Sequence, residues 1–65
     1  MANHRSARLK IITNEALKFD PSKPIPRDEL LKIAIKYGKT NPFMNVDKTT
    51  LKKDIETVLI REDLT

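Results

Sequence analysis

The sequence predicts an all-α fold: one compact three-helix domain, helix-turn-helix-like, with little or no wing. Three segments carry apolar residues at spacings of three and four, which is the period of a helix with one buried face. Proline-containing stretches separate these segments, and 65 residues support one hydrophobic core. We therefore expect a single domain over residues 1–65, with helices at about 5–19, 26–37 and 47–60.

The first expected helix, residues 5–19, has a wide apolar stripe. Asp20 and Pro21 should end it, because proline lacks the amide proton that a continuing helix needs. The segment 22–26 contains two more prolines, which favours an extended connection whose Ile25 turns back onto the core. The stripe is formed by residues three or four apart: Leu9, Ile12, Ala16 and Phe19. Ile11 and Leu17 broaden it.

The second expected helix, residues 26–37, begins at a proline and ends before the only glycine of the chain. Proline is tolerated in a first turn, where Asp28 and Glu29 also complement the positive end of the helix dipole. We expect Gly38 to adopt the left-handed conformation that often closes a helix. The core stripe comprises Leu30, Ile33, Ala34 and Tyr37.

The third expected helix, residues 47–60, has the clearest start signal. Asp47 can accept hydrogen bonds from the unpaired amides of the first turn, and Val46 and Leu51 have the spacing of a hydrophobic staple. Before it, the segment 39–45 is expected to be a loop that Phe43 and Met44 anchor against apolar neighbours. The buried stripe comprises Leu51, Ile55, Val58 and Leu59, with Leu64 covering the far end.

No group of residues points to catalysis, a cofactor or a metal site. His4 is the single histidine and cysteine is absent, so the usual metal ligands are missing, and one glycine cannot build a phosphate-binding loop. Asp28 and Glu29 are adjacent on a helix and point about 100° apart, so they cannot act on one proton together. The acids of the third helix interleave with basic residues as on a solvated helix face: Asp54, Glu56, Glu62 and Asp63 with Lys52, Lys53 and Arg61. We expect a binding protein and not an enzyme.

The chain is basic, and most of the excess lies at its beginning. The net charge is +4 and the sequence pI is about 9.6. Residues 1–18 hold four basic side chains and one acidic one, a balance of +3. Such a balance favours an anionic partner: DNA, RNA or an acidic protein surface. The absence of cysteine, of a signal peptide and of a long apolar stretch predicts a cytoplasmic protein that does not bind membranes.

The order of motifs resembles the N-terminal helix-turn-helix of DeoR-type bacterial repressors. The residues concerned are Arg8-Leu9-x-x-Ile12, Asp28-Glu29-Leu30-x-x-x-Ala34 and Val46-Asp47-x-Thr49-Thr50-Leu51-Lys52-Lys53-Asp54-Ile55-x-x-x-Leu59. In that family a segment V-S-x-x-T-[IL]-[RK]-[RK]-D-[IL] forms the recognition helix, and here Asp47 takes the serine position. The resemblance implies that Lys48, Thr49, Lys52 and Lys53 face DNA, with Lys52 and Lys53 against phosphate and Thr49 near base edges. The segment from Gly38 to Val46 departs from it, because it is longer than the tight turn of the motif.

Residues 28–60 are also similar to the SAP and HeH helix-extended-loop-helix modules, several of which bind DNA or RNA. The matching pattern is Leu30-x-x-Ile33-Ala34-x-x-Tyr37-Gly38, a loop, then Lys48-x-x-Leu51-x-x-x-Ile55 and Leu59. The longer loop suits this pattern better. In this case Arg5, Arg8 and Lys10 of the extra first helix would add phosphate contacts.

We expect a small DNA-binding transcriptional regulator of bacterial or phage type, with RNA as an alternative target. The competing hypothesis is a small inhibitor or adaptor that docks on another protein and uses its basic residues for solubility alone. Salt distinguishes the two, since binding to a phosphate backbone weakens steeply with added salt and docking in an apolar groove does not. The sequence leaves the oligomeric state open, with Ile60 and Leu64 as candidates for a homodimer seam.

Overall fold

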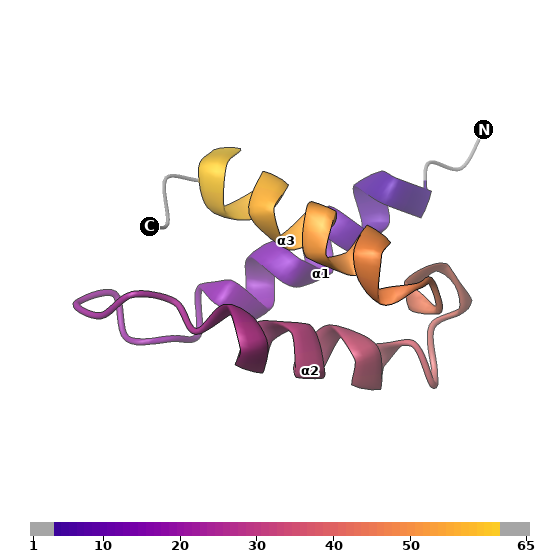
Figure 1. Ribbon diagram of the computed structural model, residues 1–65, viewed down its shortest axis with the longest axis horizontal. Helices are drawn as coiled ribbons and strands as arrows, with labels where there is room; N and C mark the ends of the chain where they lie inside the picture. The colour runs from indigo at the N-terminus through magenta and orange to yellow at the C-terminus, as the bar shows by residue number, and fades with distance from the viewer. Residues whose placement is uncertain (1–3, 62–65) are drawn as a thin grey trace.

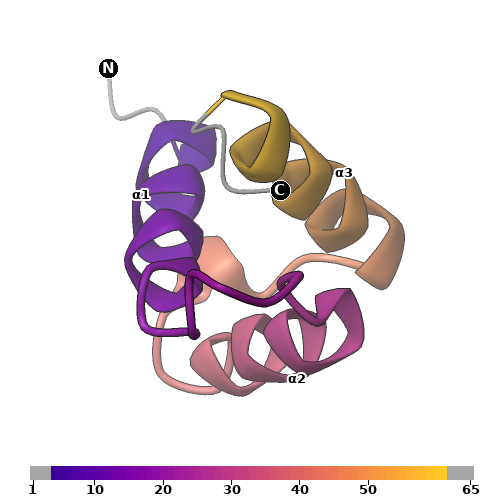
Figure 2. The same cartoon turned by 90° about the vertical axis from the view of Figure 1, so that its left-hand side faces the viewer.

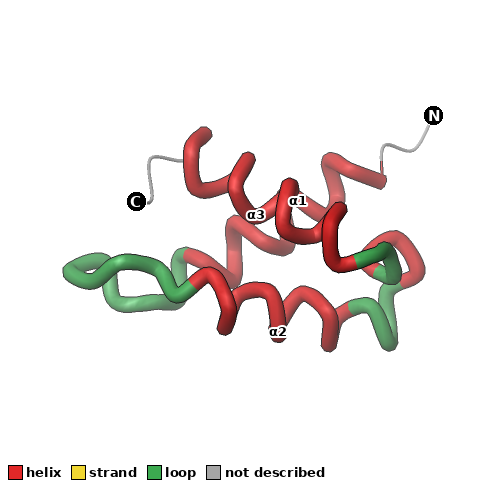
Figure 3. Tube along the Cα trace, in the orientation of Figure 1, coloured by secondary structure: helices red, strands yellow, loops and turns green. Residues whose placement is uncertain are grey.

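The computed structural model describes residues 4–61 as three α-helices and one short 3-10 helix. The order is α1 (His4–Ala16), α2 (Arg27–Tyr37), η1 (Pro42–Met44) and α3 (Lys48–Arg61) (Figure 1). Two loops join the helices at opposite ends of α2, and no strand occurs in residues 4–61 (Figure 3). The all-α, three-helix prediction is confirmed. Within the same residues, no helix has the length and apolar character needed to cross a membrane.

The three helices surround one hydrophobic core, and each helix contacts the other two (Figure 2). The Cα radius of gyration is 11.1 Å, close to the ~11 Å expected of a compact chain of this length. The buried apolar residues come from every helix and from both loops: Ile12, Ala16, Ile25, Leu30, Ala34, Met44, Leu51, Ile55, Val58 and Leu59. The stripe predicted for residues 51–59 is therefore confirmed in full. Leu64 lies outside the described residues.

The first helix ends at Ala16, three residues before the predicted end. Beyond Leu17 the backbone bonds shorten from i→i−4 to i→i−3, as in Lys18 N–H to the Glu15 carbonyl at 3.2 Å. The helix cannot continue into Pro21, and the tighter turn brings Phe19 back against the core. Leu17, which was expected to broaden the buried stripe, is 61% exposed.

Both loops are anchored by the apolar residues that the sequence indicated. Ile25 is buried between two prolines in the first loop. In the second loop Met44 is buried and Phe43 packs partly against the core. These contacts fix the two connections on the core without regular secondary structure.

Gly38 does not adopt the predicted left-handed conformation. Its φ and ψ are −59° and −21°, which is right-handed helical backbone, and its N–H still bonds to the Ala34 and Ile35 carbonyls. Space explains the glycine instead: a Cβ at this position would lie 3.1 Å from the carbonyl oxygens of Ile35 and Met44. A side chain at this position would therefore require the end of α2 or the second loop to shift by a few tenths of an ångström.

Asp47 stands immediately before α3, where the capping residue was predicted. Its carboxylate accepts a hydrogen bond from the Thr50 hydroxyl, and its carbonyl accepts one from the Leu51 N–H. The Thr50 hydroxyl is the main reason that the pKa of Asp47 lies below its ordinary value. The start of α3 is therefore defined by local hydrogen bonds, and the exposed residues of its first two turns have a fixed orientation.

Candidate nucleic-acid interface

The first two turns of α3 present an exposed basic surface. Lys48, Thr49, Lys52 and Lys53 are all exposed, as predicted. Thr49, Lys52 and Lys53 lie off the apolar stripe, and Lys48 is exposed as the first residue of the helix. Successive helical residues turn by about 100°, so Lys52 and Lys53 point to the two sides of the outward face and Thr49 points between them. We call these four residues the lysine surface.

The lysines of this surface have no ion pair with any acid of the described residues. Most acids elsewhere in residues 4–60 are already engaged, in ion pairs or in hydrogen bonds to hydroxyl groups. Asp28 is the acidic side chain of these residues without such a partner. The positive charge that remains uncompensated belongs to lysines with exposed side chains: Lys10, Lys23, Lys36, Lys39, Lys48, Lys52 and Lys53. The lysine surface is the part of α3 where such charges gather.

Arg5 adds to the lysine surface from α1. Its Nη2 donates to Thr57 Oγ1 at 3.4 Å, and its Nε lies 3.7 Å from Asp54 Oδ1. The side chain nevertheless remains 58% exposed. Thr57 is four residues after Lys53, so Arg5 stands beside the Lys53 edge of α3. Arg5, one of the residues expected to contact phosphate from the first helix, therefore lies next to the lysine surface.

Arg8 has a different role from the one expected. Its Nε lies 2.6 Å from Asp54 Oδ2, its Nη1 reaches the Phe43 carbonyl oxygen at 3.4 Å, and its side chain is only 12% exposed. Asp54 is 2% exposed, so the prediction that it belongs to a solvated helix face is wrong. The Arg8 guanidinium solvates this carboxylate inside the protein, which is why a charge is tolerated there. Arg8 is occupied in holding α1 to α3.

Lys10 faces away from α3. It lies midway between Arg8 and Ile12, which both point inward, and is rotated by about 160° from each. Its side chain is exposed, but on the opposite side of α1 from the contact with α3. The three basic residues predicted to act together in α1 are thus separated by the fold, and Arg5 alone stands beside the lysine surface.

A third arginine, which the sequence did not single out, reaches the other edge of α3. Arg27 is the first residue of α2, and its Nε lies 2.7 Å from Glu56 Oε1 and 3.0 Å from Oε2. This contact raises the pKa of Arg27. Arg27, Glu56 and Lys52 line a common groove of about 200 Å³ between α2 and α3. No sequence spacing could show this pair, because the partners are 29 residues apart.

Glu15 joins the ends of α1 and α2. Its Oε2 accepts bonds from Lys18 Nζ at 2.8 Å and from the Tyr37 hydroxyl at 2.6 Å. The Lys18 bond, followed by the Tyr37 bond, lowers the pKa of Glu15, and the same carboxylate raises the pKa of Tyr37. Tyr37 is half-buried with its hydroxyl bonded, so it contributes to the fold.

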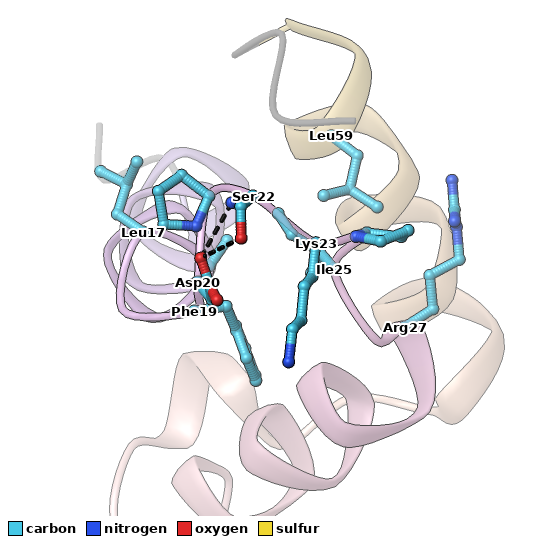
Figure 4. A pocket seen from close by; sticks show the side chains of 11 residues that line it. Leu17, Phe19, Asp20, Ser22, Lys23, Ile25, Arg27 and Leu59 are labelled. Atoms are coloured by element: carbon cyan, nitrogen blue, oxygen red, sulfur yellow. Dashed lines mark hydrogen bonds between the residues drawn. The ribbon is translucent and has the colours of Figure 1, made fainter.

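One hollow of the described residues lies beside Leu59, toward the opposite end of α3 from the lysine surface (Figure 4). It measures about 440 Å³ and is bounded by the first loop and by Leu59. Lys23 extends across it, while the Asp20 carboxylate accepts bonds from the Ser22 N–H and hydroxyl (Figure 4). Among the described residues of α3, Leu59 alone lines this hollow, so none of the four residues of the lysine surface borders it.

The described residues contain no cluster of three or more potential metal ligands. His4 is exposed, with its ring 6.4 Å from that of Phe43 in a tilted arrangement. Comparison of the chain with protein-family models, with curated proteins and with solved structures gave no match.

Proposed function

We propose that this protein binds nucleic acid through the lysine surface of α3, with duplex DNA as the partner, and acts as a small DNA-binding regulator. The observation that carries the proposal is the exposure of Lys48, Lys52 and Lys53 on two successive turns, without an ion pair within the described residues. A phosphate backbone gains from such charges because each contact releases condensed counterions.

The position of the surface favours a duplex. A single exposed helix fits into the major groove of DNA, which is about 12 Å wide. With the helix so placed, Lys52 and Lys53 point to opposite sides and reach toward phosphates, while Thr49 between them points to the base edges. Arg5 extends the contact beside Lys53. The resemblance to DeoR-type repressors suggests the same use of Thr49, Lys52 and Lys53, and the resemblance to SAP modules suggests a phosphate contact for Arg5.

The proposal is tested by reversing two charges of the lysine surface. The variant Lys52→Glu/Lys53→Glu is compared with Lys23→Glu/Lys39→Glu, which changes the net charge equally at exposed, unpaired lysines outside the helices. Mobility shifts on mixed-sequence duplex DNA should show affinity reduced more than about tenfold for the first variant, with a salt slope lower by about 2. The control should bind close to the wild type.

Thermal melts check that both variants remain folded. We expect no large loss of stability, because the replaced lysines are exposed and have no ion pair in the described residues. Equal loss of affinity in the two variants would show that only the overall charge matters, and it would contradict the assignment to α3. Single-stranded RNA of the same length, used as a competitor, tests RNA as the alternative target.

One observation favours the second candidate, a protein partner. Ile60 is 76% exposed and lies on the outward face of α3, one turn beyond Glu56. An exposed apolar residue beside charged ones is common at protein interfaces, although a single such residue is also normal on a free surface. Binding that is insensitive to salt and is lost in Ile60→Gln would favour this candidate.

A further inference from the structure

One carboxylate lies within the outward face of α3, between the two lysines that we assign to phosphate. Of the acids in residues 48–60, Asp54 is buried and Glu56 is exposed. Lys52 precedes Glu56 by four residues, and Lys53 precedes it by three. Around the helix axis, Lys52 therefore lies about 40° to one side of Glu56, and Lys53 lies about 60° to the other side. A phosphate held by these lysines therefore lies near a negative charge that repels it.

Glu56 is paired with a cation from another helix. Although both lysines lie one turn away, the structure pairs its carboxylate with Arg27, through contacts of 2.7 and 3.0 Å. Arg27 and Lys52 line the same groove between α2 and α3. A guanidinium, whose planar donors match a phosphate, thus stands at the edge of the lysine surface, held toward Glu56 by its Nε.

We propose that Arg27 is a further phosphate-binding residue of this surface and that Glu56 competes with nucleic-acid phosphate for it. The inference rests on the proposed function of α3. Arg27 and Glu56 have side chains that are 54% and 48% exposed, so water and salt screen their attraction. Arg27 can therefore exchange a carboxylate for a phosphate by rotating its side chain alone. Glu56 sets the strength and the salt dependence of binding.

The test removes the competing charge with Glu56→Gln and uses Asp28→Asn as the matched control. Asp28 lines the same groove and has no ion pair in the described residues, so Asp28→Asn removes one negative charge from the groove without releasing an arginine. The probe is a mixed-sequence DNA duplex, with affinity measured from low to moderate salt. We expect Glu56→Gln to bind roughly fivefold tighter at low salt, with a salt slope steeper by about 0.9, the value for one added phosphate contact.

Asp28→Asn should tighten binding less and leave the slope unchanged, because it adds no phosphate contact. The double variant Arg27→Gln/Glu56→Gln should return the slope to the wild-type value, which identifies Arg27 as the group released. Equal behaviour of Glu56→Gln and Asp28→Asn, with the wild type binding DNA, would overturn the inference and leave the proposed function standing. A wild-type chain that binds no DNA would overturn both.

Discussion

Two close arginine–carboxylate pairs tie α3 to the other helices, and the two carboxylates stand two residues apart on α3. Arg8 of α1 pairs with Asp54 at 2.6 Å, and Arg27 of α2 pairs with Glu56 at 2.7 Å. The two contacts have nearly the same length, and both join an arginine Nε to a carboxylate oxygen, but Asp54 is buried and Glu56 is half exposed. The environments of the two pairs therefore differ far more than their geometry.

Burial decides what each pair can do. Water cannot replace a lost partner inside the protein, so breaking the Arg8–Asp54 pair leaves an unsolvated charge. Water and salt replace a lost partner at the surface, so the Arg27–Glu56 pair can open without disturbing the helices. The buried pair holds the fold, and the exposed pair remains available for exchange with a ligand.

The largest effect on stability is expected from Asp54→Asn. This variant leaves the Arg8 guanidinium in a buried place without a counter-charge, and the free energy of unfolding should fall by about 3 kcal/mol or more. For a domain of this size that is a large part of the total stability. Urea denaturation followed by circular dichroism measures the loss.

An equal destabilisation by Glu56→Gln, two residues farther along α3, would contradict the difference that we assign to burial. Glu56→Gln should keep its melting temperature within about 3 °C of the wild type.

Replacing both buried partners should recover most of the loss. In Arg8→Met/Asp54→Leu no buried charge remains unpaired, because Arg5, the other arginine near Asp54, is 58% exposed. Well-packed apolar residues often match or exceed a buried ion pair. We expect the free energy of unfolding to lie within about 1 kcal/mol of the wild-type value, as measured by urea denaturation. If the double variant were as unstable as Asp54→Asn, the loss would come from the packing of these side chains and not from an unpaired charge on Arg8.

The Glu15 side chain is more exposed than that of Asp54 and less exposed than that of Glu56. Its contribution to stability should be smaller and should depend on pH. Its pKa in the folded protein is lowered, chiefly by Lys18, below the ordinary value of 4.5. The stability it supplies is therefore present above pH 4.5 and is lost as the pH falls through the folded pKa. Glu15→Gln should be less stable than the wild type at neutral pH, with the difference shrinking in acid. Urea midpoints at about pH 7 and about pH 3 measure this, and a constant difference would contradict the assignment.

Periodicity predicted the helices and most of the core, because burial of an apolar stripe depends on local spacing. Leu51, Ile55 and Val58 are buried as their spacing indicated. Asp54 lies on the same stripe, three residues after Leu51 and four before Val58, so an acid in a buried register was visible in the sequence. The identity of its partner was not, because the approach of Arg8 depends on how α1 packs on α3.

The basic residues of α1 are close in the sequence but do not share one surface of the protein. Counted along the chain, Arg5, Arg8 and Lys10 form a cluster, but the helix turns Lys10 away from the side occupied by Arg8. The four residues of the lysine surface were predicted correctly as exposed, because Thr49, Lys52 and Lys53 lie off a clear stripe and Lys48 begins the helix. Arg27 and Glu56 could not be paired from the sequence, because tertiary packing alone brings them together.

The most direct measurement is the salt dependence of wild-type binding to a mixed-sequence DNA duplex. If Lys48, Lys52 and Lys53 each neutralise a phosphate, the logarithm of the association constant should fall against the logarithm of salt concentration with a slope of about −3. Binding that is absent at low salt, or that shows no dependence on salt, would contradict a phosphate-binding role for α3.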